Sequence, residues 1–480
     1  MIEKHIMKTF KIQILVLLMG ALFLHSCDDF LEVLPQEAMD ADEALTTPEN
    51  VKATLIGAYL ETRSRWTFGS QFNEYAELLG TSGHLQHVGS HRQPQEMLEK
   101  NIAVNNSYVE SSWIIAYSLV NTLNNVIHAI DVLDENDRDR VKGEALFLRG
   151  MVYFELTRLW GLPYVPGQTN DQPGVPLILT PTLGAPDALP VARETVANCY
   201  QQVLLDLKDA KELLPHSNGV FADSFAASAL LSRVYLQIGD FQRAAEEADH
   251  VIESGHYQLN PTPFSAFNNP QPTQEDIFSL QNSLTSHTIW LPERYGSLNG
   301  LGRGDYQFSN DFMELFEPAD LRGQLQEETH TGYTLENIHS MYYIGVGAIR
   351  SGGVNTAKWG NYYTAIPLIR LAEMYLTRAE ANYELMDQGS AQVGAVSPKE
   401  DINVIRSRAN APLFDTAPGR DDIRLERYFE LCWEGHRIHD LKRWQHHVGA
   451  YPFDAGNLIL PIPVREIETN PLLEQNPYYL

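Results

Sequence analysis

Apolar residues recur at spacings of three and four along four long segments, and this pattern constrains the fold more than any other feature of the chain. The four segments are residues 141–160, 195–214, 366–386 and 421–445. Such spacing places the apolar side chains on one face of an α-helix. We therefore predict long amphipathic helices here, with Thr195 and Asp421 as N-caps. Similar patterns predict further helices near residues 48–62, 107–133 and 224–254.

Residues 226–254 predict a pair of closely packed helices. Tyr235 is followed four residues later by Gly239, and then by the small residues Ala244, Ala245 and Ala248. This order resembles a tetratricopeptide repeat, in which small residues let two helix backbones approach. A plain helical hairpin is the alternative. In either case we predict a mainly α fold, with tetratricopeptide-like helical pairs that carry long irregular loops.

Two long segments lack helical periodicity. Residues 161–194 are rich in proline, and residues 255–365 are rich in glycine, asparagine, proline and aromatic side chains. Irregular segments of this length inside a globular protein are usually functional or disordered. Because aromatic residues are rare in disordered chains, we predict that residues 255–365 form an ordered recognition region with short strands or helices.

Composition excludes several classes of protein. The chain has 44% hydrophobic and 20% charged residues, which is typical of globular proteins and not of disordered, collagen-like or polytopic membrane proteins. Its 35 Lys and Arg residues oppose 62 Asp and Glu residues, for a net charge of −27. Because such an acidic surface repels phosphate groups, we predict no nucleic-acid partner.

The N-terminus has the features of an export signal. Three lysines precede the apolar run at residues 12–24, which is too short to span a membrane. The next residues, Leu24-His25-Ser26-Cys27, resemble the lipobox of bacterial lipoproteins, and Asp28 and Asp29 follow. We predict a signal peptide at residues 1–26 and lipid attachment at Cys27. Ordinary cleavage near Ser26 is the alternative.

Short motifs then follow in a characteristic order along residues 27–480. They include Gly143-Glu144-Ala145-Leu146-Phe147-Leu148-Arg149, Pro367-Leu368-Ile369-Arg370-Leu371-Ala372-Glu373, Glu434-Gly435-His436-Arg437 and Asp440-Leu441-Lys442-Arg443-Trp444. In order and spacing they resemble the SusD/RagB family of nutrient-binding lipoproteins. Tyr478 departs from the pattern, because a glycine is common at that position.

The resemblance implies an N-terminal half at residues 27–260 and a C-terminal half at residues 261–480, loop-rich over 261–365 and helical afterwards. It also implies a lipid-anchored protein of the outer membrane, exposed at the cell surface, that caps a SusC-like TonB-dependent transporter. The ligand would be an oligosaccharide or, as in the RagB branch, a peptide. Neither catalysis nor a cofactor is implied. From the residues alone, a secreted hydrolase and a pure interaction scaffold stay open as alternatives.

Aromatic side chains in the loops are the candidate ligand-binding residues. A flat aromatic ring can pack on the apolar face of a sugar, while nearby polar groups bond to its hydroxyls. The candidates are Arg65, Trp66, Asn73, Trp290, Tyr295, Arg303, Asp305 and Tyr306. The resemblance supports the two regions that hold them and not the individual residues, and buried packing is the alternative for each aromatic. The tryptophans inside helical patterns, Trp113, Trp160, Trp433 and Trp444, are predicted to lie in the core.

Other candidate chemistry is explained better by structure than by function. Glu430 and Glu434 are spaced to share one helix face, and we predict structural ion pairs there and not acid/base catalysis. His84, His87 and His91 have a spacing that could bind zinc on a helix, but neighbouring glycines favour a loop without metal. Cys199 and Cys432 are predicted to be free buried thiols.

Overall fold

The structure is a computed structural model that describes residues 45–184, 187, 189–282 and 289–480. The predicted signal peptide and Cys27 lie outside these residues and stay predictions. Leu45–Leu480 cluster as a unit, and the division predicted at residue 260 falls inside it and is not tested. None of the helices described is both long enough and apolar enough to cross a membrane.

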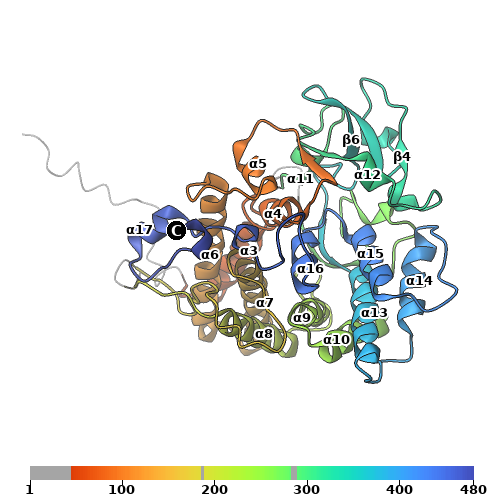
Figure 1. The fold of residues 1–480 in the computed structure, drawn as a ribbon. Helices are drawn as coiled ribbons and strands as arrows, with labels where there is room; N and C mark the ends of the chain where they lie inside the picture. The colour runs from red at the N-terminus through yellow and green to blue at the C-terminus, as the bar shows by residue number, and fades with distance from the viewer. Residues whose placement is uncertain (1–44, 185–186, 188, 283–288) are drawn as a thin grey trace, which may run out of the picture. The chain divides into compact units, whose positions relative to one another are not determined.

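A succession of helices forms the scaffold, and each packs against the next along the chain (Figure 1). Its members are α3 (Pro48–Thr62), α6 (Ser107–His128), α7 (Glu135–Trp160), α8 (Val196–Leu213), α9 (Ser224–Ile238), α10 (Phe241–Glu253), α13 (Leu371–Asp387) and α14 (Pro398–Arg408). Most of their buried side chains join one large apolar core, and part of α13 packs with α14 in a second cluster around Leu376, Ile402 and Ile405. The prediction of a mainly α fold built from tetratricopeptide-like helical pairs is confirmed.

The α9–α10 pair shows why the local sequence specifies a hairpin. Gly239 ends α9 in the left-handed region, at φ +76°, where its N–H donates to the last carbonyls of the helix. A Cβ at this position would lie 2.7 Å from Cγ of Pro166. Ala244, Ala245 and Ala248 of α10 are fully buried, and α10 packs against both α9 and α13. The small residues therefore allow the close approach that the sequence predicted.

The helix predicted at residues 366–386 begins later than expected. Residues 366–370 form strand β7 (Ile366–Arg370), which pairs with β2 (Asp276–Leu280), and α13 begins only at Leu371. Pro367 explains the shift, because proline disfavours helical geometry in the residue before it. The partner strand lies some 90 residues earlier in the chain, so periodicity alone could not reveal it.

The helix predicted at residues 421–445 is broken in two. Helix α15 (Arg420–Leu431) has Gly419 as its N-cap, not Asp421, and α16 (Arg437–Arg443) follows after five non-helical residues. Trp433 and Gly435 in this break have positive φ angles, +66° and +85°. Glu434 lies in the break, so the prediction that it shares a helix face with Glu430 is wrong.

Both glutamates nevertheless bind the same buried arginine. Arg370 Nη1 lies 2.6 Å from Glu430 Oε1, and Arg370 Nε lies 2.7 Å from Glu434 Oε2. Lys358 Nζ adds an ion pair of 2.8 Å to Glu434. Burial raises the pKa of Glu434, but Arg370 and Lys358 together lower it by more than burial raises it, so the net shift is downward. The charges are structural, as predicted, but they join β7 to the α15–α16 connection and do not act along one helix.

Short strands and single turns fill the predicted recognition region. Four of its strands join one strand from outside the region in a small sheet. The order of this sheet is β1 (Leu85–His87, the strand from outside), β3 (Tyr306–Phe308), β6 (Ser351–Thr356), β5 (Tyr342–Val346) and β4 (Leu325–Gln326). Figure 1 shows β4 and β6 beside the short helix α12 (Asn310–Met313).

The remaining helices of the described residues are short. They are α4 (Gln71–Gly80), α5 (Arg92–Leu98), α11 (Leu291–Tyr295) and α17 (Val464–Thr469), with 3₁₀ turns at Ile130–Val132, Phe264–Ala266, Leu321–Gly323, Leu335–Asn337, Gly456–Leu458 and Pro477–Tyr479.

The predicted core residues are buried. The four tryptophans assigned to the core are all at most 9% exposed. Cys199 and Cys432 are buried free thiols, as predicted. Trp160 also fastens the C-terminal tail, because its indole N–H donates to the Pro461 carbonyl at 3.0 Å and its own carbonyl accepts from the Asn476 side chain at 2.9 Å.

Candidate functional site

The turn between α3 and α4 presents the first pair of predicted ligand residues, Arg65 and Trp66. The Gln71 N–H donates to the Arg65 carbonyl at 2.9 Å and closes the turn. Gly69 fits because a Cβ there would lie 2.2 Å from the Arg63 carbonyl oxygen. The Gly69 carbonyl accepts a bond of 3.2 Å from the Trp290 N–H. This long-range bond brings Trp290, more than 200 residues later, to the same place.

Arg65 lies between the two tryptophans. Its guanidinium carbon is 4.2 Å from the ring centroid of Trp66 and also 4.2 Å from that of Trp290. The ring of Tyr108, at the start of α6, meets Trp66 edge-on at 5.3 Å. All four side chains are partly exposed. We call Arg65, Trp66, Tyr108 and Trp290 the tryptophan–arginine cluster.

A network of buried charges supports this cluster from beneath. Arg294 donates to Asp305 Oδ2 at 2.9 Å and to the Tyr108 hydroxyl at 2.8 Å. The Tyr306 hydroxyl donates to Glu74, which also lies 3.8 Å from Arg294 Nε. Burial lowers the pKa of Arg294, but Glu74 and its other neighbours raise it by more, so the guanidinium stays charged. This ionic network therefore holds Tyr108 in place, and Arg294 also lies 5.7 Å from the ring centroid of Trp290.

Two further arginines extend the support toward solvent. Arg303 Nε lies 3.1 Å from Asp305 Oδ2, and Arg350 Nη1 lies 2.5 Å from Asp305 Oδ1. Their side chains are 24% and 19% exposed. Arg303 also donates to the Ser90 hydroxyl at 3.3 Å. Asp305 thus orients three guanidiniums at once.

Three of the predicted ligand residues lie below the surface. Tyr295, Asp305 and Tyr306 were predicted to bind ligand, but all three are 0% exposed and present no surface to a ligand in this structure. Burial and the neighbouring Glu74 raise the pKa of Tyr306 well above its usual value. The central aromatics were assigned from their position in a loop-rich segment, but β3 and α11 turn these side chains inward.

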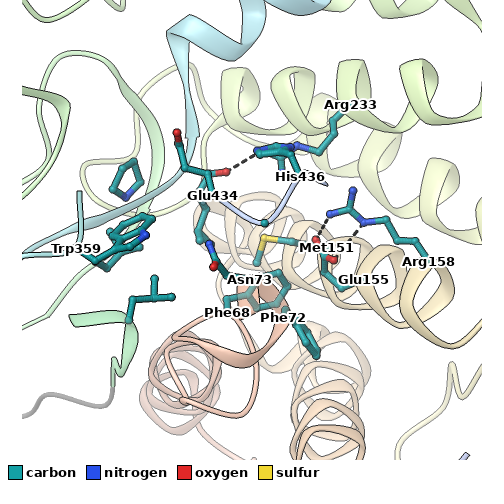
Figure 2. A pocket seen from close by; sticks show the side chains of 15 residues that line it. Phe68, Phe72, Asn73, Met151, Glu155, Arg158, Arg233, Trp359, Glu434 and His436 are labelled. Carbon is teal, nitrogen blue, oxygen red and sulfur yellow. Dashed lines mark hydrogen bonds and ion pairs between the residues drawn. The ribbon is translucent and has the colours of Figure 1, made fainter. Parts of the chain in front are cut away.

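Asn73 also lies elsewhere than predicted. Its amide donates to the Trp433 carbonyl at 2.9 Å and lines an internal cavity beside Phe68 and Phe72 (Figure 2). The cavity has a volume of about 40 Å³, with Glu155, Arg158 and His436 on other walls. Ligand pockets usually have several hundred Å³, whereas this space suits one or a few ordered waters. Asn73 therefore links α4 to the α15–α16 connection and is not in the cluster.

A second hollow offers an alternative binding surface. It is an open groove of about 360 Å³ between the end of α4, the end of α5 and residues 448–451. Tyr451, 38% exposed, is its one aromatic lining residue among the described residues. Lys100 points three N–H donors at the carbonyls of Leu78, Thr81 and Leu98. Because the Lys100 ammonium already donates to these three carbonyls, it has little capacity left for a ligand. The groove therefore offers fewer aromatic and charged side chains to a ligand than the cluster does.

The predicted zinc alternative has no geometric support among the described residues. His84 Nδ1 is 3.0 Å from the Tyr428 hydroxyl, and His87 Nδ1 is 3.0 Å from Gln95 Oε1. The ring of His91 packs near Tyr108, 6.2 Å away. No group of three His, Cys, Asp or Glu side chains suited to a metal ion occurs in the described part of the chain.

The sequence missed three residues that shape the site: Tyr108, Arg294 and Arg350. Tyr108 follows the N-cap Asn106 in the first turn of α6, and an aromatic at an exposed helix start was a usable signal. The local sequence around Arg294 and Arg350 does not mark them as site residues, because only the tertiary fold brings them to Asp305.

Comparison with known proteins gives consistent matches. Residues 29–236 match the family described as "Starch-binding associating with outer membrane", and residues 322–457 match the "SusD family". The chain is 27% identical to "SusD-like protein P2" of Formosa agariphila, over 98% of this chain and all of that protein. It is 24% identical to a "SusD-like protein" of Bacteroides ovatus, over 97% and 98% of the two chains. It is also 31% identical to "Starch-binding protein SusD" of Bacteroides thetaiotaomicron, but over only 29% of this chain and 30% of that one.

The fold is shared with solved structures. A SusD superfamily protein from Bacteroides thetaiotaomicron superposes with a TM-score of 0.74 at 26% identity, covering 90% of this chain and all of that one. A SusD superfamily protein from Bacteroides vulgatus gives a TM-score of 0.74 at 24% identity, with 90% and 99% covered, and supports the fold alone. Because family matches lie in both halves and the helical scaffold is common to these structures, the chain belongs to the SusD/RagB family.

Proposed function

We propose that the protein binds oligosaccharides through the tryptophan–arginine cluster. The observation that carries this proposal is the grouping of three partly exposed aromatic rings, from segments far apart in the chain, beside a buried network of ion pairs. Rigid aromatic surfaces suit the apolar faces of sugar rings. The description of one matched family and the name of one relative both refer to starch binding, which agrees with a glycan as ligand.

We further propose that Cys27 carries a lipid anchor and that the protein acts at the outer membrane beside a SusC-like TonB-dependent transporter. The lipobox-like sequence before Cys27 supports the anchor, and the description of the matched family supports the membrane. The role is capture and delivery, without catalysis. Cys27 lies outside the described residues and the transporter is a separate protein, so each is tested by an experiment of its own.

Calorimetry with a panel of plant, host and microbial oligosaccharides tests the ligand. We expect Trp66→Ala and Trp290→Ala to weaken binding of the retained glycan by roughly tenfold or more, since an aromatic contact contributes about 1 kcal/mol beyond its buried area. Tyr478→Ala is the matched control, because Tyr478 is 51% exposed and far along the chain in the C-terminal 3₁₀ turn. If Tyr451→Ala abolishes binding and both tryptophan variants retain it, the site is the open groove instead.

The same panel separates the other functions. A peptide digest that binds where no glycan does would move the ligand to the peptide class. Chromatography of the bound glycan after incubation should recover it intact, and shortened products would support a hydrolase. Binding of neither glycan nor peptide to the purified chain or to its complex with the transporter would favour an interaction scaffold.

Membrane association is tested in cells. We expect native protein to stay in the membrane fraction after a carbonate wash, and Cys27→Ala to be lost from it, because stable anchoring requires acyl chains. Purification in mild detergent should recover a β-barrel partner with the native protein. A Cys27→Ala protein that remains membrane-bound would contradict the anchor, and a pull-down without a barrel would contradict the transporter.

A further inference from the structure

Arg65 is the one member of the tryptophan–arginine cluster that carries a charge, and no described residue pairs with that charge. Among the residues that the structure describes, its side chain donates no hydrogen bond and forms no ion pair, and its contacts are the two indole rings. The neighbouring Arg294, Arg303 and Arg350 all bind Asp305. Arg65 therefore has hydrogen-bonding capacity that the fold does not use.

The two rings hold this capacity ready for a ligand. A guanidinium has five N–H donors in its plane, arranged as a fork that fits the two oxygens of a carboxylate or sulfate. Its guanidinium carbon lies 4.2 Å from both ring centroids, so the side chain is already confined and loses little freedom on binding. Arg65 also covers one face of each indole, so the two tryptophans cannot hold a sugar between them.

Arginine charges gather beside the cluster, although the whole chain is acidic. Arg294, Arg303 and Arg350 all pair with Asp305, and Arg294 also lies 3.8 Å from Glu74. The chain as a whole carries −27. Because charges farther away than about 8 Å are largely screened at physiological salt, a bound anion responds mainly to the local cations.

From these observations, and on the basis of the proposed glycan-binding function, we propose that the cluster selects acidic oligosaccharides. Arg65 forks onto a carboxylate or sulfate of the ligand, while the sugar ring packs on the exposed surface of Trp66, Tyr108 or Trp290. A neutral glycan offers the same apolar face but no anion, so it leaves the guanidinium without a charged partner.

The test compares ligands that differ only in charge. Calorimetry with the full chain uses an oligogalacturonide and its methyl-esterified form, and a sulfated galactan oligosaccharide and its desulfated form, which separate carboxylate from sulfate. We expect the charged member of at least one pair to bind about tenfold or more tightly. The preference should shrink as salt is raised from 50 to 300 mM. Equal affinity within both pairs for the native chain would overturn the proposal without any variant.

Variants of Arg65 locate the preference. Arg65→Gln should weaken the charged ligand more than the neutral one, so that the ratio of the two affinities falls to about one, whereas Arg65→Lys should keep part of the preference through its charge. Arg243→Gln is the matched control, since Arg243 is an exposed arginine near a ring, 5.7 Å from that of Tyr235, on a different helix. Tryptophan fluorescence reports whether the indole stack survives each change.

The outcomes distinguish this inference from the proposed function. If Arg65→Gln and Arg65→Lys weaken charged and neutral ligands equally, Arg65 only positions the rings, and the inference fails while glycan binding stands. If the native chain binds no glycan of either kind, both fail. If polyglutamate binds and glycans do not, the anion is a peptide carboxylate and the inference is likewise overturned.

Discussion

Replacing Arg370 by methionine should strongly destabilise the fold, because it strands buried negative charge. Arg370 pairs with Glu275 at 3.0 Å, with Glu430 at 2.6 Å and with Glu434 at 2.7 Å. Its side chain is 2% exposed, and those of the three glutamates are 0%, 1% and 6% exposed. Removing one member of a buried ion pair typically costs about 3–5 kcal/mol.

The ion-pair partners that each glutamate keeps without Arg370 show which carboxylate loses most stabilisation. Glu430 keeps Arg322 and Arg408, and Glu275 keeps Arg408. Glu434 keeps only Lys358 after losing two hydrogen bonds to Arg370. Adding Glu434→Gln to Arg370→Met removes the stranded charge and should recover part of the loss. With the single variant Glu434→Gln, these two variants and the native protein form a double-mutant cycle.

Urea unfolding followed by fluorescence and circular dichroism measures the effect, provided that the two transitions coincide. Arg420→Met is the matched control. Arg420 pairs with Glu384 and Asp387, but its side chain is 37% exposed, so we expect a loss within about 1 kcal/mol. If Arg370→Met costs no more than Arg420→Met, the reasoning from buried charge is refuted.

The pH dependence supplies an independent check. In the native fold the pKa of Glu434 is lowered, so its stabilisation is present above the unfolded value of 4.5 and is lost as pH falls through the folded value. Without Arg370 this pKa should rise, and ionised Glu434 should then destabilise the fold. The difference between native and variant stability should therefore be larger at pH 7 than at pH 4.5.

Three other changes have defined outcomes in the same urea assay. Gly239→Val should destabilise by about 1–2 kcal/mol, because φ is +76° and a Cβ would meet Pro166, and an unchanged midpoint would contradict this. Burial raises the pKa of Glu77 to about 7, so Glu77→Gln should stabilise at pH 8 and show no gain at pH 5. Burial lowers the pKa of Lys442 to about 7 from 10.5, so Lys442→Met should stabilise at pH 7 and lose its advantage near pH 10.

Local sequence predicted the elements that local interactions determine. The α8 helix follows its predicted N-cap Thr195, whose hydroxyl accepts from the Asn198 N–H at 3.1 Å. The α9–α10 hairpin follows from Gly239 and the alanines after it. Caps, turns and periodic apolar faces lie within a few residues of one another, so they can be recognised without knowledge of the tertiary structure.

Errors arose where distant residues override the local pattern. Residues 366–370 have the apolar spacing of a helix, but their pairing with β2 makes them a strand. The α15–α16 break depends on Glu434 reaching Arg370 and on the Gly435 N–H donating to Glu77 at 2.9 Å. These partners lie 64 and 358 residues away in sequence, which places them beyond any window of helical periodicity.

The candidate site divides in the same way. Residue type and loop position indicated Arg65, Trp66 and Trp290 as candidates, and composition showed that the chain is globular and strongly acidic. Only the tertiary structure decided that these three side chains meet, and that Tyr295 and Tyr306 are buried beneath them. The physical reason is that exposure and charge pairing depend on contacts between segments more than 200 residues apart, whereas helix formation depends on neighbours within one or two turns.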